Sequence, residues 1–128
     1  MDLKRRIEEF KEMEYEFNKD FYATIKEQQH PHTLFIACSD SRVDAETMFQ
    51  AHAGEIFQIR NVANIVPREE EPDTHPSVVS AIEYAVIVLG VENLIVCGHS
   101  NCGGCAAIRN LEKYKEKLPY TAEWISQS

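Results

Sequence analysis

The sequence has 128 residues, 44% of them hydrophobic, which is enough chain for one domain with a modest core and too little for two. Thirteen basic against twenty-one acidic residues give a net charge of −8, which disfavours nucleic acids and anionic membrane surfaces as partners. No apolar run approaches the ~18 residues of a membrane span, and the N-terminal sequence MDLKRRIEEF lacks the apolar run of a secretory signal. We therefore expect one cytoplasmic domain over residues 1–128, with no nucleic-acid or membrane partner.

Residues 1–28 carry the pattern of one long amphipathic helix that starts at residue 2. Its apolar side chains recur at spacings of three, four or seven residues: Leu3, Ile7, Phe10, Phe17, Phe21 and Ile25. A stripe of this length must be buried, either against its own domain or against a second subunit. The sequence leaves both options open.

Residues 29–128 alternate between short apolar runs and helical patterns. Strands are predicted at 33–37, 56–60 and 93–98, and helices at 44–50, at 77–89, from Gly104 towards Lys117, and from Pro119 through Trp124. The charged, proline-rich residues 67–76 predict a solvated loop. This alternation predicts an α/β fold in which helices flank a central parallel β-sheet.

Polar residues follow each predicted strand. The first strand runs into Cys38-Ser39-Asp40-Ser41-Arg42, the second into Arg60-Asn61-Val62-Ala63-Asn64, and the third into Gly98-His99-Ser100-Asn101-Cys102-Gly103-Gly104. If the first and third strands are neighbours, Cys38, His99 and Cys102 converge at the carboxyl end of the sheet, where open α/β sheets build their sites. Two thiolates and one imidazole form a zinc set that leaves the fourth tetrahedral position for water or substrate.

The cysteines also allow other interpretations. Three of the four lie within nine residues, which in a reducing compartment favours metal or redox chemistry over structural disulfides. Cys38 by itself is typical of a small buried hydrophobe, and Cys102 with Cys105 forms a C-x-x-C pair like those of dithiol redox centres. That pair alone leaves His99 without a role. We expect Cys97, in an apolar strand, and Cys105, on a helix face, to lie in the core.

Several motifs together resemble one family. CSDSR, GEIFQIRNVAN, AIEYAV and GHSNCGG, in this order over roughly residues 26–108, look like the β-class carbonic anhydrases. The resemblance implies that Cys38, His99 and Cys102 bind one Zn²⁺ per chain, with Asp40 and Arg42 as a catalytic pair beside it. It also implies reversible hydration of carbon dioxide to bicarbonate and a proton by a zinc-bound hydroxide.

The plant-like subdivision of that family lines its substrate pocket with residues that have matches here. By this resemblance Gln29, Phe57, Tyr84 and the backbone amide of Gly103 bind substrate. The resemblance further implies that the pocket lies at a subunit interface, so that the chain forms a homodimer or a higher homo-oligomer and uses residues of both subunits.

The resemblance also indicates which parts of the family fold this chain contains. Three strands in the order 2-1-3 are expected, whereas family chains continue beyond the region of Trp124 with a further helix and strand, so we expect those C-terminal strands to be absent. The alternatives are a catalytically impaired zinc-binding fragment, a related carbonyl sulfide or carbon disulfide hydrolase, and a redox protein built on the C-x-x-C pair.

Overall fold

The computed structural model describes residues 1–68 and 75–127, so residues 69–74 of the predicted loop lie outside the described part. The strands are β1 (Thr33–Cys38), β2 (Ile56–Asn61) and β3 (Asn93–Cys97). The α-helices are α1 (Leu3–Glu9), α2 (Lys19–Ile25), α3 (Ala45–Phe49), α4 (Pro76–Glu83), α5 (Gly103–Ile108), α6 (Leu111–Lys115) and α7 (Pro119–Ile125). Wider π-helical turns form η1 (Phe10–Tyr15) and η3 (Tyr84–Val88), and a 3₁₀ turn forms η2 (Val62–Asn64).

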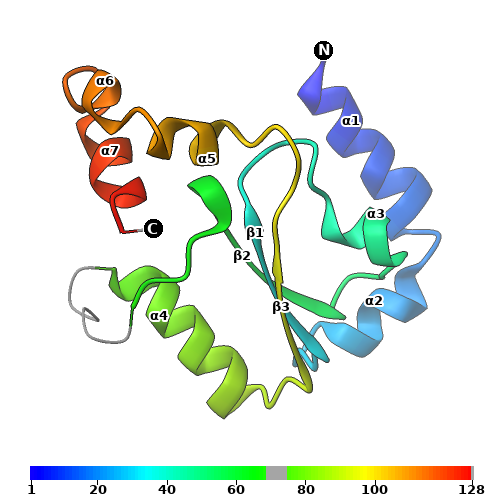
Figure 1. Ribbon diagram of the computed structural model, residues 1–128. Helices are drawn as coiled ribbons and strands as arrows, with labels where there is room; N and C mark the ends of the chain where they lie inside the picture. Colours follow the sequence, from blue (N-terminus) through cyan, green and yellow to red (C-terminus); the bar gives the residue numbers. More distant parts are fainter. Residues whose placement is uncertain (69–74, 128) are drawn as a thin grey trace.

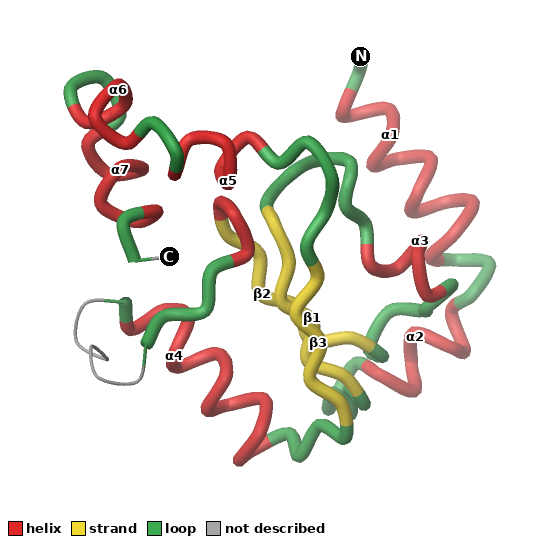
Figure 2. The backbone as a smooth tube through the Cα atoms, viewed as in Figure 1, coloured by secondary structure: helices red, strands yellow, loops and turns green. Residues whose placement is uncertain are grey.

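The described strands form one parallel sheet in the order β2-β1-β3, which confirms both the predicted fold class and the predicted strand order. Every residue of the central strand β1 is buried, as its continuous apolar sequence predicts. Leu34 and Ile36 pack on one face with residues of α4 and η3, and Phe35 and Ala37 pack on the other face beside α3. Helices therefore flank the sheet in the arrangement that Figures 1 and 2 show.

A third apolar cluster lies at the carboxyl end of the sheet. It joins Cys38 of β1 and Cys102, which precedes α5, to Ala63 of η2, Ala107 of α5 and Ile125 of α7. The indole Nε1 of Trp124 donates a hydrogen bond of 2.8 Å to the carbonyl of Val62 and so ties α7 to η2. The two thiols are thus enclosed by apolar side chains from three separate elements.

The prediction of one long N-terminal helix is wrong, because the helix breaks at Asn18. Residue 18 leaves the helical region (φ −104°, ψ 27°), and its side-chain amide donates to the carbonyl of Glu14 at 3.0 Å. Asparagine side chains compete with the backbone for such hydrogen bonds and so favour helix ends. The amide of Glu16 reaches the carbonyl of Lys11, which widens the preceding turn of η1.

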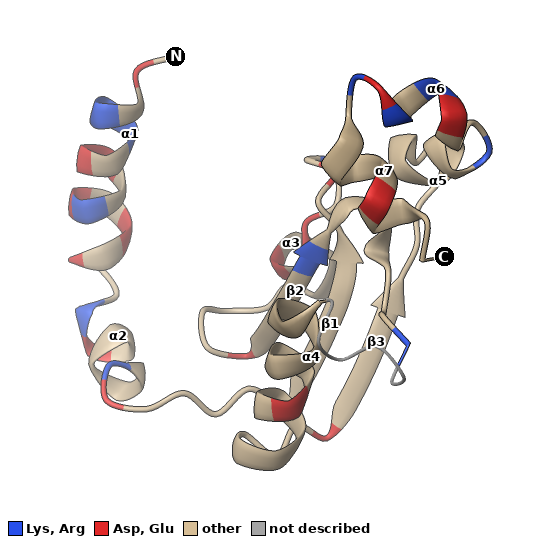
Figure 3. Ribbon diagram, turned by 90° about the vertical axis from the view of Figure 1, so that its left-hand side faces the viewer, with Lys and Arg blue, Asp and Glu red and all other residues tan. Residues whose placement is uncertain are grey.

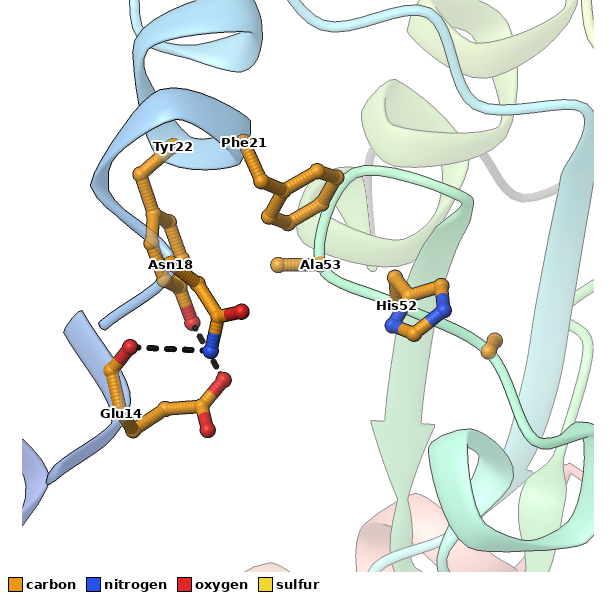
Figure 4. Close-up of a pocket in the computed structure, with 7 residues that line it drawn as sticks. Glu14, Asn18, Phe21, Tyr22, His52 and Ala53 are labelled. Carbon is orange, nitrogen blue, oxygen red and sulfur yellow. Dashed lines mark hydrogen bonds between the residues drawn. The ribbon is translucent and has the colours of Figure 1, made fainter.

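The segment from α1 to α2 forms an arm beside the sheet body (Figure 3), and among the described residues none of α1, η1 or α2 is buried. The arm meets the body where the Phe21 ring lies 5.8 Å from that of His52. Figure 4 shows the pocket of about 400 Å³ at this junction, with Glu14 and Tyr22 on the arm side and Ala53 on the body side. Burial within the same chain therefore does not account for the apolar stripe.

Three further predictions need correction. The helix predicted at 77–89 begins at Pro76 and becomes π-helical from Tyr84, and the helix predicted to run towards Lys117 divides at Asn110 into α5 and α6. Cys105 is exposed and not part of the core, since α5 turns that face to solvent, whereas Cys97 is partly buried against β1 residues. No helix within residues 1–68 and 75–127 is long and apolar enough to cross a membrane.

Candidate metal centre

Two loops at the carboxyl end of the sheet bring the predicted metal ligands together. Cys38 ends β1, while His99 and Cys102 lie in the loop between β3 and α5, whose strand pairs directly with β1. The two Sγ atoms are 3.8 Å apart, and these two atoms and a ring nitrogen of His99 all lie within 4.8 Å of one another. In Figure 1 both loops arch over the same end of the sheet.

The imidazole of His99 has one nitrogen engaged and one available. Nδ1 lies 2.9 Å from the carbonyl oxygen of Ser100, so in the neutral ring it donates that hydrogen bond and leaves a lone pair on Nε2. Nε2 is buried and has no hydrogen-bond partner among the described residues. Metal-binding histidines show this arrangement, in which a carbonyl fixes the tautomer of the ring. Two thiols with a buried, unpartnered imidazole nitrogen are a donor set that suits zinc.

Burial of Cys38 opposes ionisation of its thiol, but neighbouring donors outweigh that effect. In the metal-free chain a protonated His99 imidazole, the backbone amides of Asp40 and Ala63 and the thiol of Cys102 together lower the pKa of Cys38 to about 7. Thiolate is the form of cysteine that binds metals. The site therefore favours the protonation state that metal binding needs.

Asp40 and Arg42 form a charged pair beside these groups. Nε and Nη2 of Arg42 donate to Oδ1 and Oδ2 of Asp40 at 2.9 and 2.7 Å, and the amide of Arg42 donates to Oδ1 at 2.9 Å. These hydrogen bonds hold the pKa of the Asp40 carboxyl well below its usual range. Oδ2 lies 3.8 Å from Nε2 of His99, while Nη2 of Arg42 also donates to the carbonyl of Asn101 at 3.1 Å. The pair thus links the two loops and faces the cluster with an ionised carboxylate.

Three of the predicted substrate residues lie at the other end of the sheet. Phe57 pairs in register with Leu34, whereas Cys38 pairs with Asn61, so about 13 Å of strand separates them at ~3.3 Å per residue. The rings of Phe57 and Tyr84 stack with centroids 6.1 Å apart. Tyr84 and Gln29 both line a pocket of about 410 Å³. The structure thus groups these three side chains with one another and not with the Cys38 cluster of the same chain.

Gly103 is the fourth predicted substrate residue and is the one that lies beside the cluster. It directly follows Cys102 and is the first residue of α5. In the described structure, a Cβ added at Gly103 would meet no atom within 4 Å, so the backbone on this side is open.

Two functional features were missed by sequence reasoning. Arg60 donates side-chain hydrogen bonds to the backbone of the Cys38 loop, and the side chain of Asn61 bonds both the amide and the carbonyl of Ile65 across η2. Their position at the carboxyl end of a strand that ends beside the site was the signal that could have pointed to them.

The comparisons with known proteins agree with this geometry. A sequence model of the family described as "Carbonic anhydrase" matches residues 33–128, three quarters of the chain. The carbonic anhydrase of Helicobacter pylori is 44% identical over 119 residues, which cover 91% of this chain and 54% of that protein. The structure of the beta-carbonic anhydrase CcaA superposes with a TM-score of 0.93 at 36% identity and covers 98% of this chain and 55% of that one.

A tetrameric beta-carbonic anhydrase of Sordaria macrospora matches with a TM-score of 0.64 at 28% identity, over 88% of this chain and 67% of that one. The chain belongs to the carbonic anhydrase family. Its fold and relatives are those of the β class, as the resemblance predicted. The chain spans about half the length of the curated relatives that it matches.

Proposed function

We propose that this chain catalyses the reversible hydration of carbon dioxide to bicarbonate and a proton. The observation that carries the proposal is the convergence of Cys38, Cys102 and the unpartnered Nε2 of His99, all within 4.8 Å, next to an ionised carboxylate. Zinc held by these three side chains supplies a Lewis acid that makes water a nucleophile near neutral pH. Family membership supports the same reaction.

In this proposal Asp40 orients the attacking water. Its carboxylate stays ionised at neutral pH because Arg42 binds both of its oxygens, so it accepts hydrogen bonds and donates none. Oδ2, the oxygen that lies 3.8 Å from His99 Nε2, accepts a hydrogen bond from that water and turns the lone pair of the water oxygen towards the carbon of CO₂. Arg42 holds the carboxylate in place and links it to the loop of Asn101.

We further propose that the substrate pocket is completed by a second copy of the chain. Gln29, Phe57 and Tyr84 lie at the end of the sheet remote from their own Cys38, so they can line a metal centre only if it belongs to another copy. There, Gln29 and the Gly103 amide would donate to substrate oxygens, while Phe57 and Tyr84 would exclude water. The tetrameric relative of Sordaria macrospora supports a homo-oligomer.

We also propose a cytoplasmic location. A reducing compartment keeps thiols such as those of Cys38 and Cys102 from forming disulfides.

The test is to measure zinc content and CO₂ hydration on the same purified chain. We expect one zinc per chain and stopped-flow hydration well above the buffer rate. His99→Ala should lose the zinc and fall to the buffer rate, while the control His52→Ala, an exposed histidine outside the site, should keep both. One zinc per chain with hydration no faster than buffer would leave a non-catalytic zinc module. A zinc-free chain with a reversible Cys102–Cys105 disulfide would indicate the redox alternative.

A further inference from the structure

The loop that carries Cys38 and Asp40 is held from outside by Arg60, a side chain to which the proposed reaction gives no role. Nε and Nη2 of Arg60 donate to the carbonyl oxygen of Cys38 at 3.1 and 3.0 Å, and Nη2 also donates to the carbonyl oxygen of Asp40 at 2.6 Å. One guanidinium thus binds the backbone of a candidate metal ligand and that of the catalytic carboxylate.

The neighbouring residue of β2 holds the residue between them. The carbonyl of Asn61 accepts a hydrogen bond of 2.8 Å from the amide of Ser39, which extends the pairing of Cys38 with Asn61 beyond the end of β1. Residues 38, 39 and 40 are therefore each fixed by the end of β2. Within the described part of the chain, the side-chain hydrogen bonds from β2 to residues 38–40 come from Arg60.

Arginine has a specific advantage at this position. The carbonyl oxygens of Cys38 and Asp40, two residues apart, both point at the Arg60 guanidinium, and their partial negative charges repel each other. A planar guanidinium offers several donors in a fixed fork together with a positive charge, so it can bind both oxygens at once. A lysine ammonium has a single nitrogen on a flexible stem and cannot reproduce this fork.

We propose that Arg60 is a positioning residue of the metal centre. Its guanidinium fixes the backbone positions of Cys38 and Asp40. The Cys38 thiol then lies next to His99 and Cys102, and the Asp40 carboxylate lies beside these three groups. The roles of the two arginines are distinct, since Arg42 binds the carboxylate of Asp40 and Arg60 binds its backbone. The inference rests on the proposed function in so far as the cluster is a zinc site.

The test uses Co²⁺ as a spectroscopic probe of the zinc site, on the full chain and its variants. Thiolate-to-cobalt charge-transfer bands and d–d bands report the ligand geometry independently of turnover. The variants are Arg60→Ala and Arg60→Lys. The matched control is Arg109→Ala, because the Arg109 side chain is exposed and makes no hydrogen bond or ion pair within the described part of the chain.

We expect Arg60→Ala to weaken Co²⁺ binding about 10- to 100-fold, the usual effect of removing a group that orients metal ligands, and to shift the bands. Arg60→Lys should recover part of the affinity, and Arg109→Ala should match the wild type. Wild-type affinity and bands in Arg60→Ala, even with a lower Tm, would overturn the inference, because a merely structural role moves only the Tm. If Arg60→Ala does not fold, wild-type binding by Arg60→Lys would overturn it in the same way.

The proposed function can fail separately. A wild-type chain that binds cobalt, responds to Arg60→Ala as expected and yet does not hydrate CO₂ would overturn the proposed function and leave the role of Arg60 standing. A wild-type chain that binds neither cobalt nor zinc would overturn both.

Discussion

At the scale of single residues, the site depends on which atoms carry protons. Cys38 is the clearest case, because its thiol is buried and yet more acidic than usual. Asp40 shares the pattern, since Arg42 keeps it ionised in the folded chain. The folded chain therefore stabilises the ionised forms of Cys38 and Asp40. Because their pKa values are lower in the folded than in the unfolded chain, the free energy of unfolding depends on pH.

The pKa of Cys38 leads to a prediction for the metal-free chain. A pKa of about 7 in the folded state, against an ordinary value of 9.0, means that the thiolate contributes stability in full above pH 9 and loses it as the pH falls through about 7. In chelator, the Tm of the wild type relative to Cys38→Ser should therefore fall as the pH is lowered from 9 to 7. Parallel Tm profiles of the two proteins over that range would contradict the shift.

The convergence of Cys38, His99 and Cys102 could be predicted from the sequence, because these residue types in this order suit a metal site. Two cysteines and a histidine that follow strands of one parallel sheet suit a zinc site if those strands are neighbours, and the expected strand order came from the family resemblance. The role proposed for Arg60 could not be predicted in this way, since a charged residue at the end of a strand is ordinarily solvated. Its hydrogen bonds to carbonyl oxygens depend on backbone directions that the sequence does not contain.

At the scale of elements, the close contact of α5 with η2 positions Cys102. Ala63 of η2 has a positive φ of 69°, which alanine rarely adopts, and the Asn61 side chain holds this turn by bonding both backbone groups of Ile65. A Cβ added at Gly104 would lie 2.8 Å from the Ala63 Cβ and 2.9 Å from its amide nitrogen. Helix α5 can therefore reach this position only with glycine at residue 104.

We predict that Gly104→Ala destabilises the chain by about 1–3 kcal/mol, the usual cost of overpacking a tight contact, and also weakens zinc binding because α5 must move with Cys102. Gly103→Ala is the matched control, since a Cβ there meets no atom within 4 Å in the described structure. Urea unfolding and zinc titration of both variants check this. Equal stability and zinc affinity in the two variants would show that the contact does not position Cys102.

Element types were predictable from the sequence, while several element ends were not. The apolar runs of β1, β2 and β3 identify those strands correctly, and Gly90 marks the end of the helical segment that begins with α4. The break at Asn18 and the division of α5 from α6 at Asn110 depend on where an asparagine interrupts a helix, and hydrophobic spacing does not reveal this. The apolar stripe of residues 1–28 predicted burial, but no residue of α1, η1 or α2 is buried in the described chain, so its burial against a second subunit stays a prediction.

At the scale of the whole molecule, two apolar surfaces are uncovered in the described chain. One lies on the arm, and the other lies on η3 and β3 of the body, where Ile87 is 75% and Leu94 52% exposed. The arm surface comprises Leu3, Ile7, Phe10, Met13 and Phe17, and the body surface comprises Val86, Ile87, Val88, Leu94 and Val96. Exposed apolar surface of this kind marks an interface. In the proposed homo-oligomer, a second copy of the chain would cover part of this surface and would bring Gln29 and Tyr84 to a metal centre.

Subunit mixing gives the last prediction. His99→Ala removes the metal centre and keeps the remote substrate residues, while Gln29→Ala combined with Tyr84→Ala does the reverse, so each variant alone should be nearly inactive. In a heterodimer, the intact metal centre of one chain meets Gln29 and Tyr84 of the other, which restores one of the two sites.

After equimolar mixing and exchange, half of the dimers are heterodimers, so about a quarter of all sites should be complete in a symmetric dimer. Stopped-flow hydration should therefore recover to about a quarter of wild type, while mixing His99→Ala with Cys102→Ser, which both lack the metal centre, should recover none. Equal rates in the two mixtures would place all substrate residues and metal ligands of a site in one chain.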